Sequence, residues 1–327
     1  MSLDNPLTRD EDIGFGGDHE RSTFHQYRES LFETLSKERN LAILTILPAL
    51  VLFTLINVLP ILWAVTGSFF AISAFSPEWE WIGTANYVEI LNDPEFYVVL
   101  WRSVVFAGGS VALQLTYGML LAFLLNRTFR FEKVIRAIAM LPYLIPTAVL
   151  GFISLWMANS QFGIINQVLL ELGFIEKFIP FYGSLELAMA AVIVTDSWKL
   201  SIFVTIMVLA RLQSIPDGLY EAATVMGATP YEKFRDITLP NLKGVIFIVL
   251  LLRSVWMFNK FDIIYILTRG GPLGRTTTVP IWAYETAFVS TRLGKAAAIS
   301  TLLFVMLIAA AAIYFYAFEP SKEVRVE

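Results

Sequence analysis

Cysteine is absent from the 327 residues of this chain, and its two histidines, His19 and His25, both lie in the polar N-terminal region. A chain without cysteine can form no disulfide and has no thiolate nucleophile, and two tail histidines are too few for a Cys/His metal site. The sequence also has no paired-carboxylate metal motif. We therefore expect this chain to bind no metal or other cofactor and to be no enzyme on its own.

Charge is scarce as well. Asp, Glu, Lys and Arg make up 16% of the residues, the net charge is −4, and no long run of Lys or Arg occurs. Proteins that bind nucleic acid concentrate basic residues, so we expect neither DNA nor RNA as a partner. Hydrophobic residues make up 56% of the chain. A soluble domain could not bury that share, so the expected solvent is a lipid bilayer.

Six segments are apolar over the length of about 20 residues that a membrane-spanning helix needs. They are too long for barrel strands, and irregular backbone would leave polar groups unpaired in hydrocarbon. The sequence therefore predicts an all-α membrane protein with six transmembrane helices, in which Pro142 and Pro146 kink the third. The six segments are 41–65, 98–125, 134–157, 187–209, 245–267 and 296–318.

The distribution of basic residues predicts the orientation. With six spans both termini share one side, and the tails and loops of that side carry 15 Lys and Arg residues against 5 on the other. The positive-inside rule places the basic side, with both termini, in the cytoplasm. The expected domains are a cytoplasmic tail at 1–40, a transmembrane domain at 41–318 and a cytoplasmic tail at 319–327, in a multi-pass protein of the cell membrane.

The N-terminal tail contains apolar residues at helical spacing. This pattern predicts an amphipathic helix that lies on the membrane surface or against a partner. The residues that form the pattern are Phe24, Tyr27, Leu31, Phe32 and Leu35.

The 214–240 loop, between the fourth and fifth segments, encodes two short helices joined by a corner. Ser214 is a suitable N-cap for the first helix, and Pro216 fits its first turn because the missing N–H costs nothing there. Gly227 ends this helix, since glycine adopts the left-handed conformation that turns the chain. The second helix begins with a Thr229–Glu232 capping box and ends before Pro240.

One face of the first loop helix suits contact with another protein. Ala222 and Ala223 leave a flat surface that permits close approach, and Glu221 offers a fixed negative charge to a cationic partner. On the residues alone, a force-transmitting element and an ordinary stabilised connector are equally good interpretations.

The spacing within the loop resembles the EAA signature of permease subunits of ATP-binding cassette importers. In that family the loop fits a groove on the ATPase subunit, which implies a role in ATPase coupling for the matching positions. Met226 departs from the family pattern, which commonly has an acidic residue before the glycine. The matching residues are Glu221, Ala222, Ala223, Gly227, Ile237, Leu239 and Pro240.

The resemblance extends to the carbohydrate-uptake branch and its maltose-type, sugar-contacting permease subunit. The matching motifs are Leu141-Pro142-Tyr143 with Pro146, residues 212–216, and 270–272 followed by 276–278. The resemblance implies a mono- or oligosaccharide cargo, a second permease subunit, two ATPase subunits that hold ATP and Mg, and an external solute-binding protein. The chain has no phosphate-binding Gly-x-x-x-x-Gly-Lys-Ser/Thr sequence, so ATP hydrolysis must belong to another chain.

Ionisable residues inside the spans are candidate site residues, because charge at bilayer depth costs several kcal/mol on an order-of-magnitude basis. Asp196 and Lys199 lie in the fourth span, three residues apart. Arg253, Met257 and Lys260 share one face of the fifth span. One interpretation is a midplane pocket in which aromatic faces stack on sugar rings. The other is mutual neutralisation, of Asp196 by Lys199 or of Asp262 by a Lys or Arg.

The resemblance favours the pocket. The positions that correspond to the sugar-lining residues of the maltose-type subunit, together with the aromatic Trp198, are Tyr143, Thr147, Asp196, Trp198, Lys199, Leu200, Arg253, Met257 and Lys260. The five charged residues of the two spans sum to +1. An anionic solute such as glycerol phosphate is therefore an alternative cargo, and an ion-coupled secondary transporter, in which Asp196 and Lys199 relay protons, is an alternative class.

Overall fold

The computed structural model describes residues 38–73, 75–127 and 130–317. The chain divides into two compact units, the first ending at Trp63 and the second beginning at Ala64. The amphipathic helix expected in the N-terminal tail and the C-terminal tail at 319–327 lie outside the described residues.

The described part of the first unit is an apolar helical stretch. It contains α2 (Glu38–Phe53), a π-helical turn η1 (Thr54–Val58) and the start of α3 (Leu59–Gly67). The stretch Thr45–Gly67 is long and apolar enough to cross a membrane. Its large side chains, such as Leu52 and Ile56, are exposed, as lipid-facing side chains are.

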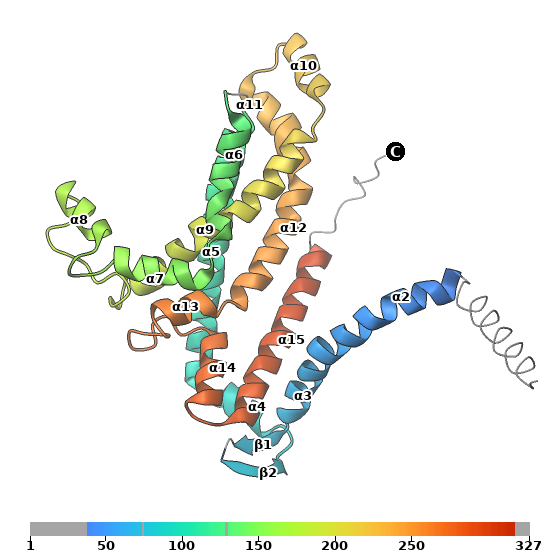
Figure 1. Cartoon of the computed structure of the whole chain (residues 1–327), viewed down its shortest axis with the longest axis vertical. Helices are drawn as coiled ribbons and strands as arrows, with labels where there is room; N and C mark the ends of the chain where they lie inside the picture. Colours follow the sequence, from blue (N-terminus) through green and yellow to red (C-terminus); the bar gives the residue numbers. More distant parts are fainter. Residues whose placement is uncertain (1–37, 74, 128–129, 318–327) are drawn as a thin grey trace, which may run out of the picture. The chain divides into compact units, whose positions relative to one another are not determined.

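The second unit contains a two-stranded antiparallel sheet at one end and helices along the rest of its length (Figure 1). Its elements are β1 (Phe70–Ser73), β2 (Ser76–Trp81), α4 (Ala85–Asn92), α5 (Pro94–Leu125), α6 (Glu132–Met140), η2 (Leu141–Leu144), α7 (Thr147–Met157), α8 (Ile164–Glu171), α9 (Ala188–Gln213), α10 (Asp217–Val225), α11 (Pro230–Lys233), η3 (Phe234–Thr238), α12 (Leu239–Phe258), α13 (Asp262–Leu267), α14 (Val279–Phe288) and α15 (Leu293–Ala317).

Five helices in the described part of the chain are long and apolar enough to span a membrane, and a sixth span exists if one bent pair is counted. The five helices are Thr45–Gly67, Pro94–Leu125, Ala188–Gln213, Pro230–Phe258 and Leu293–Ala317. Four of them agree in position with predicted segments, whereas Pro230–Phe258 covers only the first part of the predicted segment 245–267.

The third predicted span, 134–157, is not one kinked helix. The helical stretch Glu132–Leu144 and α7 meet at an angle of 90°. Ile145 has an extended backbone at ψ 123°, and Pro146 follows as the N-cap of α7. A residue before proline avoids the helical region, and proline has no N–H to continue the ladder, so the chain breaks here rather than bends gently.

The fifth predicted span, 245–267, is also wrong as a continuous helix. Helix α12 ends at Phe258, and α13 begins only at Asp262. Asn259 turns its side-chain amide back to the Val255 carbonyl at 3.0 Å. A side chain that competes for backbone hydrogen bonds helps to end the helix, and the break places Lys260 outside the regular helices.

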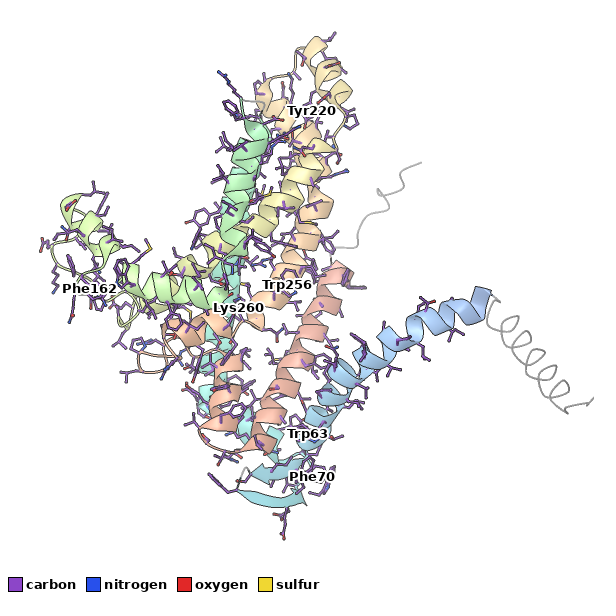
Figure 2. The ribbon with its side chains drawn as sticks, viewed as in Figure 1. Trp63, Phe70, Phe162, Tyr220, Trp256 and Lys260 are labelled. Carbon is purple, nitrogen blue, oxygen red and sulfur yellow. The ribbon has the colours of Figure 1, made fainter. Side chains whose placement is uncertain are left out.

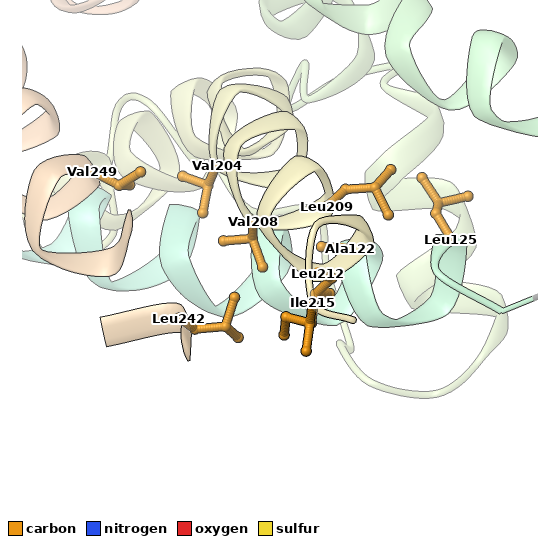
Figure 3. Close-up of a cluster of buried hydrophobic side chains, with 9 residues drawn as sticks. All are labelled: Ala122, Leu125, Val204, Val208, Leu209, Leu212, Ile215, Leu242 and Val249. Atoms are coloured by element: carbon orange, nitrogen blue, oxygen red, sulfur yellow. The ribbon is translucent and has the colours of Figure 1, made fainter. Parts of the chain in front are cut away.

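The main core lies where α5 and α9 pack against each other. They approach so closely at Gly118 that an added Cβ would lie 2.5 Å from Cβ of Val204. Only glycine permits this distance. Figure 3 shows the apolar cluster beside this contact, to which α12 also contributes. Its buried members are Ala122, Leu125, Val204, Val208, Leu209, Leu212, Ile215, Leu242 and Val249.

Candidate functional site

The first loop helix, α10, ends as the sequence predicts. Gly227 has φ +80°, the left-handed conformation that glycine adopts without strain. The Gly227 N–H donates to the Thr224 carbonyl at 3.0 Å, and the Ala228 N–H donates to the Ala223 carbonyl at 2.9 Å. These bonds satisfy carbonyl groups at the helix end and fix the corner of the 214–240 loop.

The predicted capping box at the start of α11 is confirmed. The Thr229 N–H donates to a Glu232 carboxylate oxygen at 2.7 Å, and the Glu232 N–H donates to the Thr229 hydroxyl at 3.3 Å. Reciprocal bonds of this kind satisfy two donors that the helix itself leaves unpaired.

Two details of the loop prediction are wrong. Ser214 is not the N-cap of α10 but the C-cap of α9, where its hydroxyl donates to the Arg211 carbonyl at 2.8 Å, and Pro216 is the N-cap of α10. Pro240 does not end the second loop helix. It lies in the first turn of α12, and the helix continues from Pro230 to Phe258. The preceding π-helical turn, η3, has a wider hydrogen-bond pattern, which accommodates the missing N–H of proline.

Side-chain hydrogen bonds hold the loop together. The Lys233 ammonium donates to the Thr224 hydroxyl at 2.8 Å, which joins the two sides of the corner. The hydroxyls of Tyr220 and Thr238 share a hydrogen bond of 3.0 Å. At the base, Arg211 donates to the backbone and side-chain oxygens of Asn241 at 2.9 and 3.1 Å, which ties α9 to α12. The loop is therefore a built element with defined attachments to two long helices.

The loop lies at one end of the second unit, and the β1–β2 sheet lies at the other (Figure 1). Val225 and Met226 at its corner are 90% and 86% exposed. The residues predicted to couple to an ATPase fall in two groups. Glu221, Ala222, Gly227 and Pro240 are exposed, whereas Ala223, Ile237 and Leu239 are partly buried, with Ile237 packed on the core cluster.

A second candidate site, the Lys260 cluster, consists of Thr147, Asp196, Lys199, Lys260 and Asp262. Figure 2 places Lys260 and Trp256 between Tyr220 at one end of the unit and Phe70 at the other. The Lys260 ammonium lies 2.9 Å from an Asp262 oxygen and 3.9 Å from an Asp196 oxygen. The break after α12 therefore brings one cation between two carboxylates.

The other members of the cluster come from α7 and α9. The Lys199 ammonium donates to the Thr147 hydroxyl at 3.3 Å. Asp196 is only 1% exposed, and within the described residues its Oδ2 atom has no hydrogen-bond partner. Asp196 thus pairs with Lys260 and not with Lys199. Asp262 pairs with a lysine, as the interpretation of mutual neutralisation predicts.

The second charged group is the Arg253 cluster, formed by Gln114, Phe203, Arg253, Trp256 and Met257. The Arg253 Nε atom donates to the Gln114 side-chain oxygen at 2.6 Å, and the Gln114 amide donates to the Met257 sulfur at 3.3 Å. The guanidinium carbon lies 5.4 Å from the Trp256 ring centroid and 5.7 Å from that of Phe203. Such distances permit cation–π attraction. Within the described residues, the Arg253 Nη2 atom has no hydrogen-bond partner.

The sequence prediction missed Gln114 and Phe203. Gln114 is fully buried, and it is an isolated amide in an apolar span, which is a signal that could have found it. Phe203 has no comparable signal, because one more aromatic residue in a span is ordinary. Its role depends on the packing of α9 against α12.

The predicted substrate residues do not all lie together in the structure. Thr147, Asp196, Lys199 and Lys260 meet in the Lys260 cluster. Arg253 and Met257 share a helix face, as predicted, and the partly buried Leu200 packs on the apolar cluster around Met257. Trp198 is 41% exposed between the buried Ser197 and Lys199, and Tyr143 is exposed on η2. The last two do not belong to either cluster as defined above.

These observations define a class: a helical membrane protein with a rigid helix–turn–helix at one end of its long helices and ion-paired side chains between them. The chain matches the family described as binding-protein-dependent transport system inner membrane component over residues 114–323, more than half of its length, and it belongs to that family.

Two known relatives match most of the chain. The sulfoquinovosyl glycerol transport system permease protein SmoG of Agrobacterium fabrum is 36% identical over 279 residues, which cover 85% of this chain and 90% of the relative. The trehalose/maltose transport system permease protein MalF of Thermococcus litoralis is 35% identical over 278 residues, which cover 85% of this chain and 93% of the relative. This chain is therefore similar to transport permeases.

The fold recurs in solved structures. A chain from a bacterial ABC transporter involved in the import of the acidic polysaccharide alginate matches with a TM-score of 0.77 and 21% identity, over 90% of this chain and 99% of that chain. A structure of the alginate transporter in complex with an alginate pentasaccharide-bound periplasmic protein matches with a TM-score of 0.75. At this level of identity the likeness shows a common fold.

Proposed function

We propose that this chain is a permease subunit of an ATP-binding cassette importer that carries a sugar. It forms half of the translocation pathway and pairs with a second permease subunit and two ATPase subunits, which bind ATP and Mg. An external binding protein delivers the cargo. The family description names binding-protein-dependent transport, and the two relatives are named for sulfoquinovosyl glycerol and for trehalose and maltose, which supports a sugar-containing cargo.

The observation that carries this proposal is the rigid, exposed 214–240 loop. Its helices are capped, its corner is fixed by Gly227 at φ +80°, and Arg211 ties its base to Asn241. A flexible connector would absorb a pull from a partner protein, whereas a loop with this many fixed bonds transmits it. In our proposal, closure of the ATPase subunits moves this loop, and α9 and α12 move with it.

The Lys260 and Arg253 clusters are the proposed cargo site. Asp196, Lys199 and Arg253 are buried, whereas Thr147, Lys260 and Asp262 are only partly buried. In our proposal, opening separates α9 from the segment after α12 and breaks the contact between Lys260 and Asp196. Alternating access then exposes the same groups to each side in turn.

An anionic solute is the second candidate cargo. The Lys260 cluster contains two lysines and two aspartates, and Arg253 adds a further positive charge, so the two clusters together carry +1. A cargo with a carboxylate or phosphate group would neutralise this charge. Uptake of glycerol phosphate in preference to maltose and trehalose would favour this candidate.

The test of the function is uptake into proteoliposomes that contain this chain with its partner subunits and binding protein. The proposal predicts that sugar enters when ATP is enclosed with the ATPase subunits and that a proton or sodium gradient alone drives no uptake. Gradient-driven uptake without ATP would instead identify an ion-coupled secondary transporter.

A further inference from the structure

Four aromatic side chains, Phe261, Tyr265, Tyr284 and Phe288, form a continuous series that we name the aromatic track. The Phe261 and Tyr265 rings are stacked at a centroid distance of 5.0 Å and an angle of 19°. Tyr284 lies 5.0 Å from each of these two rings, and Phe288 lies 4.8 Å from Tyr284. Each ring of the series thus touches the next.

The track begins at the Lys260 cluster. Phe261 stands in the chain between Lys260 and Asp262, whose side chains form the 2.9 Å ion pair. Tyr265 follows one turn later on α13. Tyr284 and Phe288 lie on α14, which leads toward the end of the unit where β1 and β2 lie (Figure 1). Phe288 is the last residue of α14 and is 69% exposed.

One side of the track packs on the apolar core, because Phe261 and Tyr265 lie against a buried cluster that includes Ile263 and Ile264. Helix α13 buries one face, on which Ile263 and Ile264 are almost completely inaccessible. Its other face carries Tyr265, which is only partly buried, as are Phe261 and Tyr284. The rings nevertheless keep accessible surface, from the partly buried Phe261 beside the Lys260 cluster to the exposed Phe288.

The chemistry of the track suits a sugar. A sugar ring has apolar C–H faces, which pack on aromatic rings, and hydroxyl groups at its rim, which need hydrogen-bond partners. The Tyr265 and Tyr284 rings meet edge to face at a centroid distance of 5.0 Å, and each ring carries a hydroxyl group, so polar atoms accompany the ring faces. The Arg269 guanidinium lies 6.0 Å from the Tyr265 ring and adds hydrogen-bond donors.

We propose that the aromatic track is a stacking path for sugar rings between the outer end of α14 and the Lys260 cluster. This inference rests on the proposed sugar cargo and extends it to residues outside the predicted pocket. Stacking tolerates rotation of the sugar, so a row of overlapping rings lets the cargo move by short steps without losing all contact.

The test is uptake of radiolabelled maltose and trehalose by the complete reconstituted transporter. Tyr284→Leu and Phe288→Leu keep apolar volume but remove the ring, and each should lower uptake about tenfold. Tyr284→Phe keeps the ring and should retain most uptake. The matched control is Phe162→Leu, because Phe162 is an exposed aromatic residue near α8 and outside the track.

A second measurement does not depend on transport. The chain has no cysteine, so Phe288→Cys creates a single labelling site in this subunit. A membrane-impermeant maleimide should label it from the outer side, and maltose or trehalose should slow the labelling. The same sugar should leave the labelling of Phe162→Cys unchanged.

The outcomes separate this inference from the proposed function. If the unaltered transporter imports neither sugar under ATP, the sugar assignment fails and the track fails with it. If it imports sugar and both leucine variants do so equally well, the track alone is overturned. Loss of the second permease subunit on purification of the leucine variants would show a subunit interface and would also overturn the track.

Discussion

The 214–240 loop and the Lys260 cluster are built in opposite ways. The caps and the corner of the loop are formed by bonds between residues close in sequence, such as Thr229 with Glu232. The tie at its base, from Arg211 to Asn241, spans only 30 residues. The cluster joins α7, α9 and the segment after α12, and its Lys199–Thr147 hydrogen bond spans 52 residues. The loop is thus specified locally and the cluster by tertiary packing. Substitutions in the two regions should therefore have different effects on stability.

The largest effect on stability is expected in the cluster. Lys260→Met leaves the buried Asp196 carboxylate without its cation and should destabilise the second unit by about 3 kcal/mol, as broken buried ion pairs do. Thermal unfolding in lipid nanodiscs measures this. The control is Lys243→Met at an exposed position of α12. Adding Asp196→Asn to Lys260→Met should recover much of the loss, and a loss no larger than the control's would contradict the account.

A second effect tests the close packing of α5 against α9. Gly118→Ala places a Cβ 2.5 Å from Cβ of Val204 and should cost about 1–3 kcal/mol through overpacking. Gly108→Ala is on the same helix and meets nothing within 4 Å, so it should be nearly neutral. Equal melting temperatures for the two variants would show that α5 and α9 do not pack as described.

A smaller, local effect is expected in the loop. Thr229→Ala removes the capping hydroxyl and should weaken the start of α11 by about 1 kcal/mol. Hydrogen exchange should become faster in the loop, while the Lys260 cluster keeps its protection. Faster exchange throughout the unit would contradict the view that the loop is specified locally.

The smallest effect concerns an exposed ion pair far from both regions. Glu89 of α4 accepts hydrogen bonds from Arg292 at 2.7 and 2.5 Å and from Lys295 at 2.9 Å. The Arg292 hydrogen bonds hold the pKa of Glu89 at about 2, well below its usual value of 4.5. Because the folded-state pKa is lowered, the stabilisation is complete above about pH 4.5 and disappears as the pH falls toward 2.

Solvent screens this pair, since 43% of the Glu89 side chain is exposed. Glu89→Gln should therefore cost less than about 1 kcal/mol at neutral pH. Unfolding measured at pH 7 and near pH 3 should show a smaller difference between variant and unaltered chain at the lower pH. A difference that grows on acidification would contradict this assignment.

The same contrast explains what the sequence could predict. Four spans, the Gly227 corner and the capping box follow from local patterns, and the structure confirms each. The 90° bend at Pro146 and the break before Asp262 depend on how the neighbouring helices pack. Both positions were predicted to lie within continuous spans. Asp196 and Lys199 stand one turn apart on α9, so the pairing of Asp196 with Lys260 instead required the tertiary structure.

The candidate sites show the same difference between local and tertiary specification. The proposed coupling residues were named from the loop's spacing, and they lie on α10, at the Gly227 corner, on η3 and in the first turn of α12. Gln114 could not be assigned to the Arg253 cluster from sequence, because its partner lies 139 residues away. Ser214 shows the limit of local reasoning even in the loop, since a serine beside two helices can cap either of them.

The most direct test of the account is the conformation of Gly227 in the assembled transporter. Gly227→Val cannot easily adopt φ +80°, whereas Gly227→Asn can, because asparagine tolerates the left-handed region. Both should insert and assemble in the membrane. We predict that ATP-driven uptake is lost in Gly227→Val and largely retained in Gly227→Asn, with Gly218→Ala in α10 as the unaffected control. Normal uptake by Gly227→Val would contradict the proposal that this loop couples the ATPase to transport.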